Sequence, residues 1–166
     1  MKTLLAFIAG TLAGATLIGI VAAQSVPERG INHIGMQVHD YEAAMQFYVE
    51  GLGAQEAYTV RNADGTPLLT YLQLNRETFV ELIPVPADAA TGITHFGLEV
   101  GDIDEAVARL RAYGADLADP GLTPAGARFT RVRDVTDVEI EVMEFGPDAL
   151  QSKAMAAWPD SLPVQP

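Results

Sequence analysis

The sequence contains no cysteine among its 166 residues. Disulfide bonds, thiolate ligands, cysteine nucleophiles and redox-active cysteine pairs are therefore excluded. Any metal site in this chain uses nitrogen and oxygen ligands only. If the domain is exported, its stability depends on its hydrophobic core or on bound metal, because the disulfides that staple many exported domains are missing.

Basic residues are also scarce, with 10 lysines and arginines against 22 aspartates and glutamates and a net charge of −12. They form no basic run along the chain, which excludes nucleic acid as a partner. We assign no partner to the acidity itself, since a strongly charged surface mainly favours solubility. The hydrophobic fraction of 49% is typical of a globular protein, and the length suits one ordinary domain.

Charge is missing from residues 4–22, which follow the basic residue Lys2. This apolar stretch ends in Val21-Ala22-Ala23, small residues that suit a signal peptidase. We therefore interpret residues 1–23 as a signal peptide, cleaved before Gln24, and expect a periplasmic or secreted protein. The stretch is also long enough for a membrane anchor, so the alternative is an exported domain held at the membrane. Its glycine and threonine residues favour cleavage.

One segment of the chain occurs twice. His33-Ile34-Gly35-Met36-Gln37-Val38-His39-Asp40 is echoed by His95-Phe96-Gly97-Leu98-Glu99-Val100-Gly101-Asp102, at an offset of 62 (95 − 33). Val80-Glu81-Leu82 is echoed by Ile140-Glu141-Val142, at an offset of 60 (141 − 81). Duplicated segments that pair around a pseudo-two-fold axis would bring two imidazoles and two carboxylates to one place. The repeat therefore predicts a divalent-metal site made of His33, Glu81, His95 and Glu141.

Each copy predicts a strand, a helix and three further strands. In the first copy the strands are expected at residues 31–38, 54–60, 67–74 and 78–84, with a helix from the N-cap Asp40 to about Glu50. In the second copy they are expected at residues 94–100, 115–117, 127–133 and 138–145, with a helix from the N-cap Asp102 to the stop Gly114. The prolines and glycines of residues 119–126 predict a loop.

The chain is thus divided into the N-terminal segment, a linker at residues 24–30, a domain at residues 31–146, and a C-terminal helix and tail at residues 147–166. The apolar stripe of the first helix is expected to contain Ala44, Phe47, Tyr48 and Leu52. Because each helix has to cover the apolar face of its own sheet, alternation places the four candidate ligands on the opposite face. Three large apolar side chains share that face: Phe79, Ile83 and Met143. We therefore interpret the face as the lining of a cleft.

These features resemble the vicinal oxygen chelate superfamily, the glyoxalase and extradiol-dioxygenase group. The resemblance covers residues 31–145 and rests on the duplication, on Val38-His39-Asp40-Tyr41, on Leu52-Gly53 and on Ile140-Glu141-Val142. It implies an α+β fold in which two βαβββ repeats form a curved open mixed sheet around a central cleft with a divalent metal.

The resemblance also implies ligand roles. The four candidate ligands match the ligand positions of glyoxalase I. Methylmalonyl-CoA epimerases usually have glutamine at the position of Glu81, and extradiol dioxygenases use three ligands, at the positions of His33, His95 and Glu141.

Two neutral imidazoles and two carboxylates suit zinc, nickel, cobalt, manganese or ferrous iron. Such a metal can hold two adjacent substrate oxygens as a Lewis acid, and a glutamate that leaves the metal can then move a proton. Glu81 and Glu141 are both candidates for this catalytic role. The blander interpretation is that His33 and His95 are strand histidines satisfied by hydrogen bonds. Their recurrence at matching positions, each with a glutamate, favours the metal.

The leading hypothesis is an exported metal-dependent enzyme of isomerase or lyase type that transfers a proton on a small oxygenated substrate. One alternative is an extradiol-type ring-cleaving dioxygenase with ferrous iron. Another is a metal-independent module that binds a small molecule, as drug-resistance members of the superfamily do. Glu81 favours proton transfer, because a fourth ligand occupies one of the open positions that a dioxygenase needs.

Further side chains are candidate substrate contacts: Arg131, Phe79, Tyr71 and Met143. Arg131 could contact an anionic group of the substrate, although a solvated strand arginine is the commoner case. The two aromatic rings could stack on a substrate or simply fill the cleft. His39 is expected at the surface or behind the site. The C-terminal helix is expected to dock on the domain or on a second subunit of a homodimer. Membrane contact is expected only if the N-terminal segment is retained.

Overall fold

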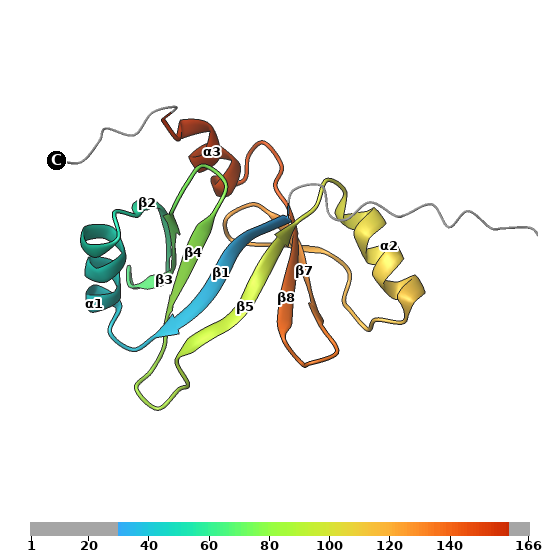
Figure 1. Cartoon of the computed structure of the whole chain (residues 1–166), viewed down its shortest axis with the longest axis horizontal. Coiled ribbons are helices and arrows are strands. Elements are labelled where there is room, and N and C mark those ends of the chain that lie inside the picture. Colours follow the sequence, from blue (N-terminus) through green and yellow to red (C-terminus); the bar gives the residue numbers. More distant parts are fainter. Residues whose placement is uncertain (1–29, 160–166) are drawn as a thin grey trace, which may run out of the picture.

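The structure is a computed structural model that describes residues 30–159 (Figure 1). All strands belong to one eight-stranded sheet with the order β2-β3-β4-β1-β5-β8-β7-β6. The elements are β1 (Gly30–Val38), α1 (Tyr41–Gln46), the π-helix η1 (Phe47–Gly51), β2 (Gln55–Arg61), β3 (Pro67–Gln73), β4 (Phe79–Pro84), β5 (Gly92–Glu99), α2 (Ile103–Tyr113), β6 (Gly121–Leu122), β7 (Arg128–Arg133), β8 (Glu139–Glu144) and α3 (Leu150–Ala157). The predicted α+β fold of two βαβββ repeats is confirmed.

The two repeats meet at the centre of the sheet, where β1 and β5 pair in antiparallel orientation. Within each repeat the first strand pairs in parallel with the last, β1 with β4 and β5 with β8. The strand order is therefore repeated on the two sides of an approximate two-fold axis between β1 and β5. This topology places the strands that carry the four candidate ligands next to one another, in the order β4-β1-β5-β8.

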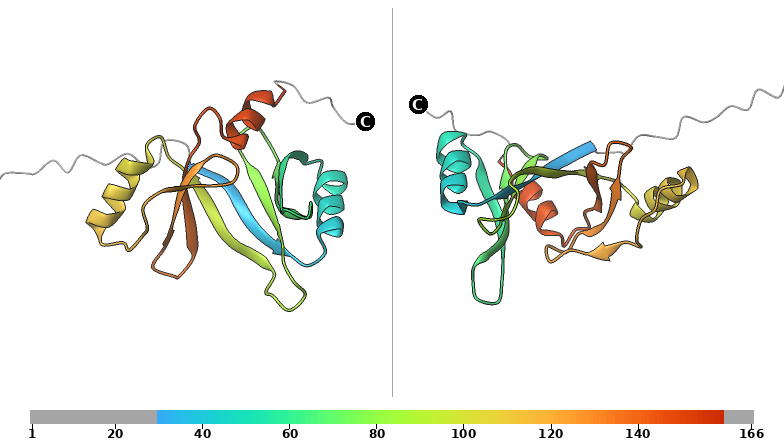
Figure 2. Two further views of the ribbon diagram at one scale, coloured as in Figure 1. Left: turned by 180° about the vertical axis from the view of Figure 1, so that it is seen from behind. Right: turned by 90° about the horizontal axis from the view of Figure 1, so that it is seen from below.

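The helices α1 and α2 begin where an aspartate caps them. The side chain of Asp40 accepts a hydrogen bond from the backbone N–H of Ala43, and that of Asp102 accepts one from Glu105. Gly114 ends α2 with a φ of 100°, a left-handed conformation that glycine adopts without strain. Each helix covers the outer face of its own repeat (Figure 2), so the inner face of the sheet is left for the site.

The first helix differs from its predicted apolar stripe. Its second half is a π-helix in which the N–H of Leu52 donates to the carbonyl of Phe47, five residues back. The wider turn shifts the helical phase, so Val49 packs against the core while Phe47 and Leu52 are exposed. The predicted burial of these two residues was wrong, because a regular α-helical period does not continue past Gln46.

The predicted strand at residues 115–117 is also wrong, and the short strand β6 forms instead inside the segment predicted as a loop. Side chains satisfy the backbone carbonyls of this region. The carbonyl of Leu117 accepts a hydrogen bond from Arg111, and that of Ala118 accepts one from Thr130. These bonds replace the ladder that a strand would need.

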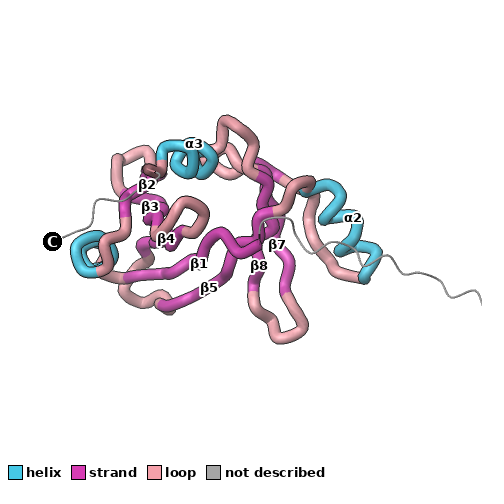
Figure 3. The backbone as a smooth tube through the Cα atoms, turned by 45° about the horizontal axis from the view of Figure 1, so that its top comes forward, coloured by secondary structure: helices cyan, strands magenta, loops and turns pink. Residues whose placement is uncertain are grey.

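The sheet curves so that the two repeats face each other across its inner side, and Figure 3 shows α1 and α2 at opposite ends of this curved band. The helix α3 lies on the inner side, between the repeats (Figure 2, right). It docks on its own chain, where the N–H of Leu150 donates to the carbonyl of Ala125 at 2.9 Å. Of the two predicted positions of this helix, the structure therefore shows the one on the domain.

The segment interpreted as a signal peptide or anchor lies outside the described residues, as does most of the predicted linker. The strand β1 already begins at Gly30, the last residue assigned to that linker. Within residues 30–159, no helix is both long and apolar enough to cross a membrane.

Candidate metal centre

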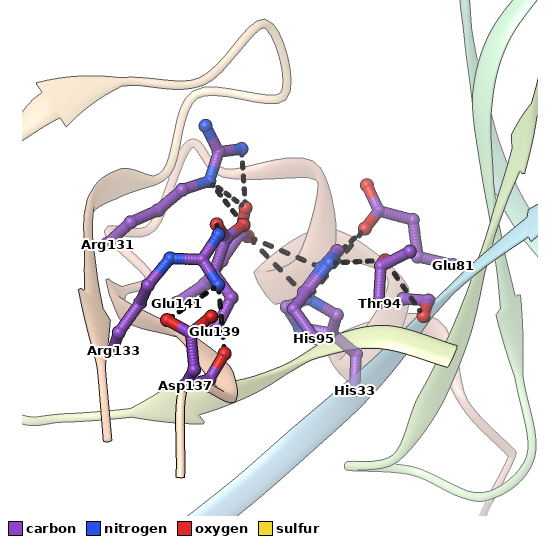
Figure 4. A network of polar contacts seen from close by, with 10 residues as sticks. His33, Glu81, Thr94, His95, Arg131, Arg133, Asp137, Glu139 and Glu141 are labelled. Carbon is purple, nitrogen blue, oxygen red and sulfur yellow. Dashed lines mark hydrogen bonds and ion pairs between the residues drawn. The ribbon is translucent and has the colours of Figure 1, made fainter. Parts of the chain in front are cut away.

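Four buried side chains meet on the inner face of the sheet, none of them more than 5% exposed: His33, Glu81, His95 and Glu141. The Nε2 atoms of the two imidazoles are 3.2 Å apart. Oε2 of Glu81 lies 3.0 Å from Nε2 of His95 and 3.8 Å from Nε2 of His33. Oε2 of Glu141 lies 3.9 Å and 3.7 Å from the same two atoms. Figure 4 shows the two carboxylates on opposite sides of the imidazole pair.

These separations match those of ligands that share one metal ion. Two ligands about 2.1 Å from one ion lie about 3.0 Å apart at a right angle, about 3.4 Å at the tetrahedral angle and about 4.2 Å on opposite sides. The distances between imidazole nitrogens and carboxylate oxygens run from 3.0 to 3.9 Å. The nitrogen and oxygen donors therefore fit a divalent cation in their chemistry, and each imidazole–carboxylate distance is compatible with a shared ion.

A bulge in each central strand orients the histidines. The pairing of β1 with β5 passes from Ile31 to His33 in one strand, which leaves Asn32 unpaired, and skips Thr94 in the other. A bulge breaks the strict alternation of a strand and re-aims a side chain. As a result, Asn32 contacts the imidazole of His33, and Thr94 contacts that of His95, although each pair is adjacent in sequence.

The bulge residues decide which ring nitrogen carries the proton. Oδ1 of Asn32 can only accept, so Nδ1 of His33 donates to it. The hydroxyl of Thr94 donates its single hydrogen to the carbonyl of Gly35 at 3.3 Å and must therefore accept from Nδ1 of His95 at 3.0 Å. In the neutral imidazoles both Nε2 atoms then carry a lone pair that faces the centre. Metal-binding histidines are held in the same way, with the second ring nitrogen donating to a fixed partner.

Glycines make room for both rings. The imidazole of His95 packs over Gly35, where an added Cβ would lie 1.9 Å from Cε1 of the ring. The imidazole of His33 packs over Gly97, where a Cβ would lie 2.0 Å from Cε1. In the β1–β5 register, His33 is paired with Gly97 and His95 with Gly35. The imidazole of each histidine therefore packs over the glycine of the other repeat. Only a residue without a side chain fits at these two positions.

Burial and charge tune the protonation of the site. Burial, with a smaller contribution from the neighbouring imidazole, lowers the pKa of His33 to about 3, so this ring is neutral near pH 7. Burial also opposes the charged form of His95, but its hydrogen bond to Glu81 and the charges of Glu141 and Glu81 outweigh that effect and raise its pKa. Burial raises the pKa of Glu81. The raised pKa of His95 reflects a surplus of negative charge that a cation would neutralise.

The two glutamates differ in their second contacts. Oε1 of Glu141 accepts hydrogen bonds from Nε and Nη2 of Arg131 at 2.9 and 2.6 Å. Arg131 also lies over the ring of Phe129 and forms an ion pair with Glu139. Within residues 30–159, Glu81 forms no ion pair with an arginine or lysine, and its close contacts are the two imidazoles. Glu141 is therefore held from two sides, whereas Glu81 is held by the imidazoles alone.

A cavity that opens to solvent adjoins the carboxylates of Glu81 and Glu141. Three of the four predicted substrate contacts line it: Tyr71, Arg131 and Met143. Phe79 does not belong to this lining. It is 1% exposed and lies against the ring of Tyr71, with ring centroids 5.8 Å apart.

The sequence interpretation missed several residues that shape the site. Asn32 and Thr94 each directly precede a ligand histidine, and a glycine follows each histidine after one residue, so a comparison of the two copies could have found them. Gln151 of α3 also lines the cavity, and no pattern in the sequence indicated it. The third histidine, His39, is exposed and bonds the carbonyl of Ala89, as expected for a residue outside the site.

The fold and the site define a paired βαβββ protein with a candidate nitrogen–oxygen metal centre. The chain belongs to the Glyoxalase/Bleomycin resistance protein/Dioxygenase superfamily, whose model matches residues 30–142. It is 32% identical over 125 residues to the uncharacterized protein YwkD of Bacillus subtilis (strain 168). The matched region covers 70% of this chain and 97% of that protein. Proteins of this family usually bind a divalent metal. Within residues 30–159, two overlapping groups could hold one: His33, Glu81 and His95, and His95, Glu139 and Glu141.

Solved structures show the same fold. The methylmalonyl-CoA epimerase from Mycobacterium tuberculosis superposes with a TM-score of 0.62 at 24% identity, over 71% of this chain and 89% of that one. The hypothetical protein BH1468 from Bacillus halodurans C-125 superposes with a TM-score of 0.60 at 20% identity, over 70% and 94%. At such identities the likeness establishes the fold alone.

Proposed function

We propose that the protein is a metal-dependent enzyme of isomerase or lyase type that transfers a proton on a small oxygenated substrate. The observation that carries this proposal is the convergence of four donor atoms, in which both imidazoles turn Nε2 toward the centre while the residue before each histidine contacts its Nδ1. The cavity beside the two carboxylates supports it, since it gives a substrate access to them. The structural likeness to methylmalonyl-CoA epimerases agrees with an isomerase type.

The two glutamates have different roles in this proposal. When bound, a divalent metal supplies a Lewis acid that holds and polarises substrate oxygens. Glu141 keeps its position because Arg131 holds its outer oxygen. Glu81 has no such clamp, and its burial raises its pKa toward the range in which a carboxylate accepts and returns protons efficiently. We therefore infer that Glu81 moves the proton and that Glu141 stays in place.

Deuterium exchange tests this assignment. Purified metal-loaded protein in D2O is expected to introduce deuterium beside a carbonyl group in at least one member of a panel of methylmalonyl-CoA and small 2-hydroxy and 2-oxo acids, as measured by mass spectrometry. Glu81→Gln is expected to slow the exchange by about 10²- to 10⁴-fold, the usual contribution of an acid–base group. Because an amide oxygen can still face the metal, this variant should keep its metal. Glu141→Ala removes the donor atom altogether and should therefore lose metal in addition to exchange.

Glu139→Gln is the matched control, since Glu139 also contacts Arg131 and forms a second acidic group with His95 and Glu141. It is expected to keep both metal and exchange. Wild-type exchange rates in Glu81→Gln would assign the proton transfer to another residue. Oxygen uptake with catechols and ferrous iron, without deuterium exchange, would establish the ring-cleaving alternative. Unchanged ligand binding after metal removal would establish the binding module.

We also propose that the protein is exported, on the sequence of residues 1–23. Cell fractionation is expected to find it outside the cytoplasm, and N-terminal sequencing of the mature protein should begin at Gln24. Full-length protein in the membrane fraction would support the anchored alternative, and full-length protein in the cytoplasm would contradict export. A homodimer stays a prediction that light scattering can check.

A further inference from the structure

The C-terminal helix α3 brings one polar side chain into the wall of the cavity. Gln151 lines the cavity together with Glu81, Tyr71 and Arg131, and it is only 1% exposed. The helix lies outside the segment that matches the family model, which ends at residue 142. A side chain on this helix is therefore placed to distinguish this chain from relatives that share only the paired repeats.

Only one end of the Gln151 side-chain amide forms a hydrogen bond within the described residues. Burial raises the pKa of Tyr71, and a hydrogen bond between its hydroxyl and the side chain of Gln151 makes a smaller, opposing contribution. Tyr71 in turn lies against the ring of His33, with centroids 5.3 Å apart. Oε1 of Gln151 is buried and has no hydrogen-bond partner among the described residues. The amide is thus oriented by the wall of the site and carries an unsatisfied acceptor.

A buried acceptor without a partner is unfavourable, and native proteins leave few of them. The position of Gln151 is not the result of a loosely placed helix. The N–H of Leu150 donates to the carbonyl of Ala125, and the neighbouring Ala149 is fully buried against Ala127 and Met143. Because the two residues that precede Gln151 are fixed in this way, the unsatisfied acceptor is a built feature of the cavity wall.

We propose that Gln151 is a specificity-determining residue that accepts a hydrogen bond from a hydroxyl group of the substrate. This inference rests on the proposed function, since it concerns the ligand of the same centre. It narrows the substrate class to small hydroxylated carbonyl compounds, in which two oxygens face the candidate metal centre and a further hydroxyl faces α3. The neutral acceptor of Gln151 and the cation of Arg131 then form two chemically different walls of one cavity.

Hydroxamates test the proposal without knowledge of the substrate, because they offer two adjacent oxygens to a metal. Propionohydroxamate has no further hydroxyl, whereas lactohydroxamate and 3-hydroxypropionohydroxamate each add one, at two different reaches. Titration calorimetry of zinc-loaded protein is expected to show that at least one hydroxylated probe binds about 2- to 12-fold more tightly than propionohydroxamate, the effect of one neutral hydrogen bond. Gln151→Met removes the acceptor and should abolish this preference, while zinc content and propionohydroxamate affinity stay unchanged.

Gln73→Met is the matched control. Gln73 is a buried glutamine that donates to the carbonyl of Arg76 and does not line the cavity, so its replacement should leave the preference intact. Equal affinity of wild-type protein for all three probes, or a preference that survives in a folded Gln151→Met variant, would overturn the inference while leaving the metal centre in place. Failure of the wild-type protein to hold zinc would instead contradict the proposed function, so the two failures are distinguishable.

Discussion

Replacement of His95 by alanine is expected to remove metal binding and activity together. The loss of a hydrogen-bonding partner behind a metal ligand already weakens metal binding by about 10- to 100-fold, so the loss of the ligand itself should exceed about 100-fold. Nε2 of His95 lies 3.2 Å from Nε2 of His33 and 3.0 Å from Oε2 of Glu81, so it contacts two of the other donors. Both groups of donors that could hold a metal within residues 30–159 contain His95, so neither is complete without it.

Metal analysis after dialysis and thermal melting would measure this effect. At about 100 times its dissociation constant, a bound metal stabilises the native state by about 2.7 kcal/mol. For a chain of this length that corresponds to a rise in melting temperature of about 5–11 °C. The rise should occur in the wild-type protein and be absent in His95→Ala. Activity is followed by deuterium exchange on any substrate that the panel identifies.

The third histidine of the chain supplies the matched control. His39 is exposed and bonds the carbonyl of Ala89, away from the four donors, so His39→Ala should keep its metal and its metal-dependent rise in melting temperature. A metal-loaded and active His95→Ala variant would falsify the ligand assignment. Loss of metal from His39→Ala would place the centre elsewhere.

Replacement of Gly97 by alanine is expected to disrupt the centre without removing any ligand. The added Cβ would lie 2.0 Å from Cε1 and 2.1 Å from Nδ1 of His33, and 2.9 Å from Oδ1 of Asn32. His33 is fully buried and has no free space into which it can move. Overpacking of this kind destabilises by about 1–3 kcal/mol and displaces the side chain. The variant should therefore lose most of its metal affinity and melt at a lower temperature.

The equivalent substitution Gly35→Ala should have the same effect through His95, whose ring atoms would lie 1.9–2.4 Å from the new Cβ. Gly146→Ala is the control, since a Cβ at that position meets nothing within 4 Å. Metal titration and thermal melting compare the three variants. Wild-type metal affinity in either Gly97→Ala or Gly35→Ala would show that the imidazoles do not depend on these glycines for their position.

Much of the fold and of the candidate site follows from local patterns in the sequence. Asp40, Asp102 and Gly114 mark helix ends by local hydrogen bonding and backbone conformation, so they were predicted correctly. The repeated His-x-Gly segments and the two repeated glutamates predicted the pairing of the repeats and the four candidate ligands that the structure brings together. Such features depend on residues close in sequence or on an internal comparison of the chain with itself.

Other features depend on contacts that no local pattern encodes. The π-helical turn that exposes Phe47 and Leu52 reflects how the helix meets its sheet, and the missing strand at residues 115–117 reflects side chains that bond its carbonyls. Alternation along the strand directed Asn32 away from the site, because a bulge exists only in the pairing of two strands. The same holds for Thr94 in the partner strand.

By itself, the sequence determined the nitrogen and oxygen donors, their duplication and the order of strands and helices, since these follow from residue type and spacing. Tertiary structure alone decided which glutamate is clamped by Arg131, which side chains turn the imidazoles, and that α3 delivers Gln151 to the cavity. The physical reason is that each of these features depends either on contacts between groups far apart in the chain or on a strand bulge that interrupts the alternation of side chains. Their positions relative to one another are settled only when the curved sheet closes around the site.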